Sequence, residues 1–336
     1  MGRYVVTRLL QLPVLLLVVS ALVFVILRLG PGSPVDLATE SSRDPAQIER
    51  IRHEWGLDQP IYVQYAQYLF RMLQGDFGRS FFGNTPVSGV IVERFPATLE
   101  LAFLGMILGG LFGISMGIIA GVKENTVVDT LARTLALAGI SLPTFWLGLM
   151  FIGLFAVKLA WLPVAGRFDA RLSLRTVTHF YVLDGLLTGN LEATFAALKH
   201  MVMPATVLGL FIAGFIARIT RATVLESMRQ EYVRTARAKG LRERIVVVRH
   251  GLRNALLPIV TIMGLQFGNL LGGAAVTETV FSYPGLGKLM VDAIYVHEFP
   301  QVQASVLLLA MTYVTVNLIV DVLYVFIDPR IRYVGG

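Results

Sequence analysis

The sequence predicts an all-α integral membrane protein with six transmembrane helices. Hydrophobic residues make up 55% of the chain, the mean hydropathy is +0.68, and only 15% of the residues are charged, whereas about a quarter are charged in soluble domains. A spanning helix needs about 20 mostly apolar residues. Six segments meet or nearly meet this length, at roughly 9–27, 98–122, 134–157, 201–217, 255–280 and 302–327.

The distribution of arginine and lysine predicts the orientation of these helices. Basic residues gather in alternate connections, most densely between Arg218 and Arg253. The first connection, of about 70 residues, also carries basic residues, but long translocated segments largely escape the positive-inside rule. We therefore expect both termini and the basic segment to be cytoplasmic (N-in, C-in) and the first connection to be external.

Three parts follow from this arrangement. Residues 1–29 are expected to form an N-terminal transmembrane anchor, because the apolar run after Arg8 is longer than the hydrophobic region of a usual signal peptide. Residues 30–97 are expected to form an external helical cap between helices 1 and 2. Residues 98–336 are expected to form a core with five transmembrane helices, including a cytoplasmic loop at 220–254.

The cap is predicted to contain two short helices. Asp44 followed by Pro45 is typical of a helix start, and a second helix is expected to begin after Pro60 and to end at Gly75, where glycine favours termination. Three tyrosines step along one face of this second helix, at Tyr62, Tyr65 and Tyr68. They form either a docking surface or a band that packs at the membrane interface.

Two spanning segments carry glycine at every fourth position. Small residues at this spacing let helix backbones approach closely in lipid, where the hydrophobic effect does not draw helices together. Static packing and a pore-lining role in helices that move past their neighbours are both open interpretations. The candidate pore or packing residues are Gly105, Gly109, Gly113, Gly117, Gly264, Gly268 and Gly272.

The sequence offers no catalytic residues, and we do not expect an enzyme. Ser115 in "GISMG" lies in the middle of a predicted helix, whereas the nucleophile elbow that this motif suggests needs a strand-to-helix turn. There are no cysteines and the five histidines lack ligand spacing, so no metal site is expected. No phosphate-binding P-loop is present. The chain is therefore expected to bind no cofactor of its own. Its net charge of +7 is interpreted as basic residues on the cytoplasmic side of the membrane, and no nucleic-acid partner is expected.

The basic loop is predicted to be a protruding knob. Val233, Ala236 and Gly240 fall on one small or apolar face of a short helix, Gly240 ends that helix, and a return helix leads into the fifth span. A small-residue face with a charged rim suits insertion into a groove on a partner. A helix lying on anionic lipid is the alternative.

Several segments resemble one known family. "EYVRTARAKGL" and "RHGLRNALLPIVT" in the basic loop are similar to the coupling loop of ABC transporter permease subunits of the dipeptide and oligopeptide import family, although Arg234 and Thr235 replace the usual Glu and Ala. "GDFGRS", "SLPTFWLGL" and "ETVFSYPGLGKL" agree with it. The resemblance assigns ATPase coupling to Glu231, Tyr232, Arg234, Thr235, Ala236, Arg237, Ala238, Lys239, Gly240 and Leu241.

The resemblance implies a transmembrane pathway subunit of an ATP-driven, binding-protein-dependent importer of peptides or related small solutes, located in the inner membrane. Its implied partners are a second homologous permease, two ATP-binding subunits that carry ATP and magnesium, an extracytoplasmic substrate-binding protein and membrane lipid. The alternative is a secondary transporter or channel whose basic loop binds lipid.

Overall fold

The computed structural model describes residues 2–29, 49, 53, 58–81 and 83–327. These residues are nearly all helical and supply six membrane spans if one bent helix pair is counted as a span. The spans lie in α1 (Gly2–Leu29), α5 (Val87–Val122), the pair of α6 (Val127–Ser141) with α7 and η1 (Thr144–Lys158), α9 (Leu191–Met228), α12 (Leu252–Val280) and α14 (Phe299–Ile327). The predicted class, an all-α membrane protein, is confirmed.

The third span differs from its prediction. The sequence suggested one helix over 134–157, but the structure has α6 and α7 bent by 101° at a short break between Ser141 and Thr144. Pro143 has no N–H to donate and restricts the residue before it to extended backbone, and Leu142 accordingly has ψ 129°. The "SLPT" stretch therefore ends one helix and begins another.

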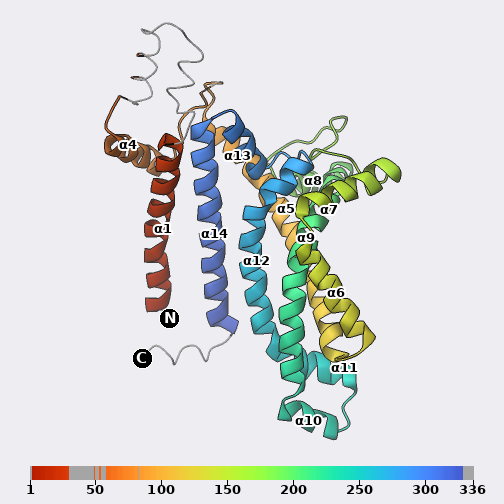
Figure 1. Cartoon of the computed structure of the whole chain (residues 1–336). Helices are drawn as coiled ribbons and strands as arrows, with labels where there is room; N and C mark the ends of the chain where they lie inside the picture. Colours follow the sequence, from red (N-terminus) through yellow and green to blue (C-terminus); the bar gives the residue numbers. More distant parts are fainter. Residues whose placement is uncertain (1, 30–48, 50–52, 54–57, 82, 328–336) are drawn as a thin grey trace.

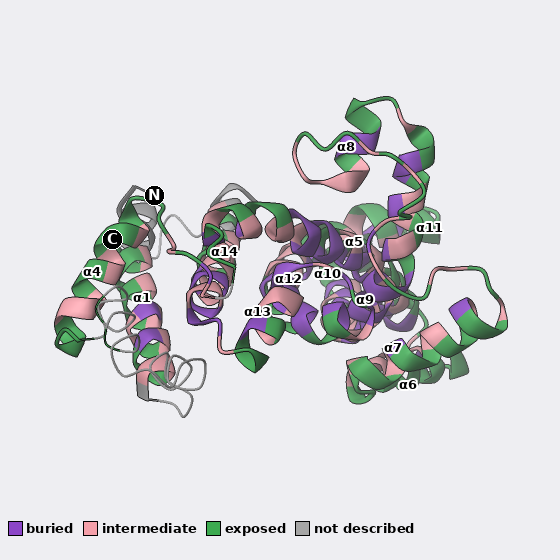
Figure 2. Ribbon diagram, turned by 90° about the horizontal axis from the view of Figure 1, so that it is seen from above, coloured by how far each residue is buried: buried purple, intermediate pink, exposed green. Residues whose placement is uncertain are grey.

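Helix α9 is central to the fold. It extends from Leu191 to Met228 and so passes both ends of the apolar segment expected at 201–217. The Asn190 side chain caps it by accepting from the backbone N–H of Ala193 at 3.0 Å. Helices α5, α6 and α12 all contact it. Viewed from above, the buried residues gather where α5, α9 and α12 meet, while α1 and α4 lie to one side (Figure 2).

The glycines of α5 bring it into backbone contact with α9. A β-carbon at Gly113 would lie 2.7 Å from the carbonyl oxygen of Ala213, and one at Gly117 would lie 2.7 Å from that of Ala217. Gly109 meets the carbonyl of Gly209 in the same way, at 2.6 Å, and Gly105 meets Leu208 and Ala205 less tightly. Any side chain on this face would separate the two helices.

The glycines of α12 are used differently. A β-carbon at Gly264 or Gly268 would collide with the Val320 or Tyr313 side chain of α14, whereas nothing lies within 4 Å of such an atom at Gly272. These glycines fit side chains rather than a neighbouring backbone. The α5 glycines face another helix of this chain rather than an open pathway. The pore-lining role suggested for both sets of glycines stays a prediction.

Helix α4 (Ile61–Leu73) begins after Pro60, and the chain turns at Gly75 with φ +77°. Tyr65 and Tyr68 pack on Phe24 of α1, with ring centroids 5.3 and 5.7 Å away. Two of the three tyrosines therefore serve packing. The helix expected after Asp44 lies mostly outside the described residues.

Helix α4 lies at the opposite end of the molecule from α10 (Glu231–Ala238), and the start of α1 lies at the same end as α10 (Figure 1). This arrangement agrees with a cap and a basic loop on opposite sides of the membrane. The division of the chain at residue 97 stays a prediction, and α5 runs continuously across that boundary.

Gly117→Ala is expected to destabilise the protein, because its methyl group meets both Ala217 and Thr220. Overpacking of this kind costs about 1–3 kcal/mol, which should lower the melting temperature of the purified protein by several degrees. Gly272→Ala is the matched control, since it adds the same methyl group where space is open. Equal melting temperatures for the two variants would contradict the close α5–α9 contact.

Candidate functional site

The basic loop is a compact knob beyond the ends of the spans (Figure 1). It consists of α10, a turn at Gly240, α11 (Glu243–Ile245) and the wide-turn helix η2 (Val246–Gly251), which leads directly into α12. The knob therefore joins the ends of two spanning helices, α9 and α12. We use "knob" for residues 229–251 below.

The knob has a small apolar core of its own. Val233, Ala236 and Val246 are buried together, with Met228 packed against them. The prediction that the small face of α10 is offered to a partner is wrong for Val233 and Ala236, which turn inward, whereas Gly240 is exposed. An isolated helix of eight residues is marginal in water, so α10 needs these contacts with η2 and α9 to stay folded.

The turn after α10 depends on glycine for its backbone shape. Gly240 has φ +75°, its N–H donates to the carbonyl of Arg237 at 2.9 Å, and the N–H of Leu241 donates to the carbonyl of Ala236 at 3.4 Å. This pair of bonds is a Schellman motif, which needs a left-handed residue at the position of Gly240. A β-carbon there would meet nothing within 4 Å, so backbone conformation alone explains the glycine.

Polar contacts fix the knob to the helices that enter and leave it. The Ser227 hydroxyl lies 2.8 Å from the carbonyl oxygen of Gly251 and 2.7 Å from the hydroxyl of Tyr232. Arg237 donates to both carboxylate oxygens of Glu243, at 2.6 and 3.1 Å. This pairing lowers the pKa of Glu243 and raises that of Arg237. Hydrogen bonds therefore hold the knob at its base, and an ion pair holds it across its turn.

The outer surface of the knob is exposed and mainly basic. Nine of the ten candidate coupling residues are exposed, and Ala236 is the buried one. Arg234 pairs with Glu231 at 2.7 Å. No nucleophile with a neighbouring base is present in this set, so its chemistry suits protein contact. The exposed residues are Glu231, Tyr232, Arg234, Thr235, Arg237, Ala238, Lys239, Gly240 and Leu241.

The "ETVFSYPGLGKL" stretch forms a corner at the outer end of α12. Both carboxylate oxygens of Glu278 are used: one accepts from the Thr98 hydroxyl at 2.6 Å, and the other accepts from the N–H of Lys288 at 2.8 Å. The Gly285 backbone lies directly against this carboxylate. Glu278 therefore ties α5, α12 and α13 (Leu286–Tyr295) together.

Two ion pairs that the sequence did not reveal connect distant segments. Arg221 of α9 donates to both oxygens of Asp129 at the start of α6, at 2.7 and 2.8 Å. Glu100 of α5 accepts from Arg167 in the outer loop at 2.8 Å. The partners are 92 and 67 residues apart, so no spacing pattern could have shown them. The sequence also places Asp321 within the last apolar segment, and its side chain lies outside the described residues.

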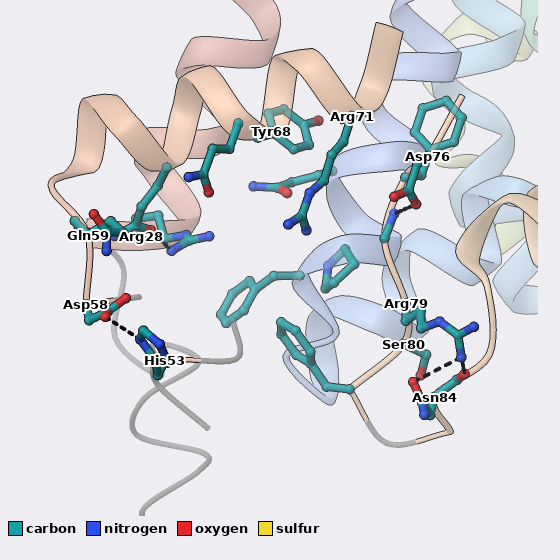
Figure 3. A pocket seen from close by; sticks show the side chains of 18 residues that line it. Arg28, His53, Asp58, Gln59, Tyr68, Arg71, Asp76, Arg79, Ser80 and Asn84 are labelled. Atoms are coloured by element: carbon teal, nitrogen blue, oxygen red, sulfur yellow. Dashed lines mark hydrogen bonds and ion pairs between the residues drawn. The ribbon is translucent and has the colours of Figure 1, made fainter. Parts of the chain in front are cut away.

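A polar pocket of about 800 Å³ lies at the outer end of the molecule. It is bounded by the end of α1, by α4, by residues 76–84 and by the start of α14 (Figure 3). Arg71 lies along this pocket, while Arg79 donates to the carbonyl of Asn84 at 3.0 Å. Arg71 has no carboxylate within ion-pair distance among the described residues.

Among the described residues, no three His, Cys, Asp or Glu side chains lie close enough to hold a metal ion. Ser115 lies on an exposed face of α5. The expectations of no bound cofactor and no catalytic residues stay predictions.

The sequence matches two parts of one family along nearly its whole length. Residues 113–333 match the binding-protein-dependent transport system inner membrane component, and residues 1–102 match the N-terminal part of such membrane components. The di/tripeptide transport system permease protein DppB of Pseudomonas aeruginosa is 44% identical over 94% of each chain. The glutathione transport system permease protein GsiC of Escherichia coli K12 is 42% identical over 99% of this chain and all of GsiC.

Solved structures agree in fold. An inward-facing MetNI methionine ABC transporter structure matches with a TM-score of 0.54 at 18% identity, covering 71% of this chain and 96% of the matched chain. A structure of an amino acid ABC transporter with histidines gives 0.50 at 12% identity, covering 70% and 94%. Together with the family match, these likenesses show that the chain belongs to the binding-protein-dependent transport system inner membrane components, the multi-pass permease subunits of ABC importers.

Proposed function

We infer that this chain forms half of the pathway of an ATP-driven importer and that its knob receives an ATP-hydrolysing subunit. The observation that carries this inference is the knob itself: a pre-folded, exposed surface that joins the ends of α9 and α12. A lipid-bound loop would need apolar side chains on the face that meets the bilayer. Here Val233 and Ala236 of α10 are used internally, and the exposed residues of α10 are mainly polar. The exposed apolar side chains of the knob outside α10 are Leu241, Ile245 and Val248.

The contacts of the knob provide a route for movement. A displacement of α10 passes to α9 and α12 through Ser227 and the shared apolar core. From α9 it passes to α5 through the glycine contacts and to α6 through Asp129 and Arg221. We infer that closure of two ATP-binding subunits moves these helices as one body and so alternates access to the pathway between the two sides.

Peptides or related small solutes are the inferred cargo. Relatives of 44% and 42% identity are named for the transport of di- and tripeptides and of glutathione, and all these substrates contain peptide bonds. In this assignment a second homologous permease completes the pathway, and an extracytoplasmic protein delivers the solute. ATP and magnesium reside on the two ATP-binding subunits.

The whole proposal is tested by tagging the chain, extracting its complex gently and reconstituting it in proteoliposomes. We expect a second permease and P-loop ATPases to accompany it, and we expect a dipeptide-loaded binding protein to stimulate ATP turnover and dipeptide uptake. Uptake that follows an ion gradient without ATP would instead establish a secondary transporter, and recovery of the folded chain alone would favour that alternative.

Thr235→Trp tests the docking surface. Thr235 is exposed at the centre of α10, so tryptophan should leave the knob folded while obstructing a partner. We expect ATPase co-purification and ATP-dependent uptake to fall at least tenfold, as expected when a bulky group enters a packed interface. Ala170→Trp, an equally bulky change in the exposed outer loop, is the control. Normal uptake by Thr235→Trp would exclude this surface from docking.

Arg71→Ala tests whether the outer pocket contributes to binding-protein contact. Arg71 lies along the pocket without a carboxylate partner among the described residues, so it is available to an acidic group. We expect a fivefold to tenfold higher binding-protein concentration to be needed for half-maximal ATP turnover, since loss of a rim charge weakens association. Gln67→Ala removes a neutral side chain from the same helix and pocket. Equal effects of both changes would indicate pocket shape rather than charge.

A further inference from the structure

A second cavity lies in the cytoplasmic half of the protein, between α5, α6 and α9. It has a volume of about 270 Å³ and its walls are almost entirely apolar. Ala132 and Ala136 of α6 and Gly214 and Ala217 of α9 keep it open, because none of them has a side chain larger than methyl. We call this cavity the α6–α9 groove.

Arginines lie at one end of the α6–α9 groove. Arg133 of α6 and Arg218 and Arg221 of α9 all line it. The 17 residues from 201 to 217 of α9 carry no charge and span about 25 Å of helix, which is close to the roughly 30 Å of a bilayer core. The arginine end therefore lies near the headgroups of the cytoplasmic leaflet, and the apolar walls lie along the acyl chains.

The arginine end carries more positive than negative charge. Asp129 accepts hydrogen bonds from Arg221 at 2.7 and 2.8 Å and forms an ion pair with Arg133 at 3.2 Å, so one carboxylate serves two guanidinium groups. Glu124, which also acts on Arg221, is paired with Arg229 at 2.6 Å.

Arg218 is exposed, and its guanidinium lies 5.8 Å from the Phe215 ring centroid. It has no carboxylate partner among the described residues. An unpaired cation beside an apolar groove calls for a ligand with a negative head and a hydrocarbon tail.

We propose that the α6–α9 groove binds one anionic phospholipid of the cytoplasmic leaflet, with its phosphate near Arg218 and Arg133 and one acyl chain along Ala132 and Ala136. Charge decides between a lipid and an apolar partner helix, because the exposed Arg218 at the end of the groove attracts an anionic headgroup. An acyl chain is thin enough to enter. The lipid would bridge α6 and α9 next to the Asp129–Arg221 pair.

This proposal concerns a lipid site and is independent of the cargo and of the ATPase contact inferred above. Burial of an acyl chain in the groove stabilises binding of any phospholipid. The proposal therefore predicts that lipids with an anionic headgroup bind more tightly than lipids with a neutral one. One cation near an anionic membrane surface contributes about 1 kcal/mol, which corresponds to about a fivefold change in affinity.

Native mass spectrometry of the complete, delipidated importer complex tests the site. The complex is titrated with phosphatidylglycerol and, separately, with phosphatidylcholine of the same acyl chains. We expect phosphatidylglycerol to bind more tightly. Arg218→Gln should reduce phosphatidylglycerol affinity about fivefold and leave phosphatidylcholine unchanged. Arg242→Gln is the matched control, because it removes an exposed cation from the knob, outside the groove, and it should change neither lipid.

A second variant addresses the apolar part of the site. Ala132→Leu fills the groove and should weaken both lipids, and a photoreactive phospholipid should label Ala132→Cys. Equal affinity of the native complex for the two headgroups, or unchanged phosphatidylglycerol affinity in Arg218→Gln, would overturn the proposal. Cross-linking of Ala132→Cys to another protein chain in place of lipid would overturn it as well.

Discussion

The contact between α5 and α9 is the constraint on which the rest of this permease depends. In lipid the hydrophobic effect does not drive apolar side chains together, so helices associate through close packing and polar contacts. The glycines of α5 allow carbonyls of α9 to approach within van der Waals distance of its backbone. Helices α6 and α12 then pack on this pair, and the ends of the bundle are held by bonded carboxylates at Asp129, Glu100 and Glu278.

The same arrangement explains why charged groups occur inside so apolar a chain. Each of these carboxyl groups has partners that use its oxygens, which is the condition for burying a polar group away from water. All three lie near the ends of the spans rather than at their centres. They connect neighbouring segments of the bundle through hydrogen bonds.

Much of this architecture was predictable from sequence because it depends on local patterns. Apolar length gave the spans, glycine spacing indicated close packing, and Gly240 correctly marked the end of α10. What could not be predicted depends on contacts between distant segments. The pairing of Asp129 with Arg221 joins segments with no shared pattern. Ala236 is buried because it packs on Val246, which lies outside α10, so the periodicity of α10 could not reveal this contact. The break at Pro143 was visible in the sequence, but hydropathy alone averaged over it.

The internal core of the knob also separates two demands on its sequence. Val233, Ala236 and Val246 maintain its shape, while Arg234, Thr235 and Ala238 face outward and contribute nothing to that core. Outward residues can therefore diverge while the shape persists. Under the proposed docking of an ATPase on the knob, the permease can follow sequence drift in that partner, or take a different one, through a few surface substitutions. Gene duplication can then yield transport systems whose components do not interchange although their membrane subunits share one fold.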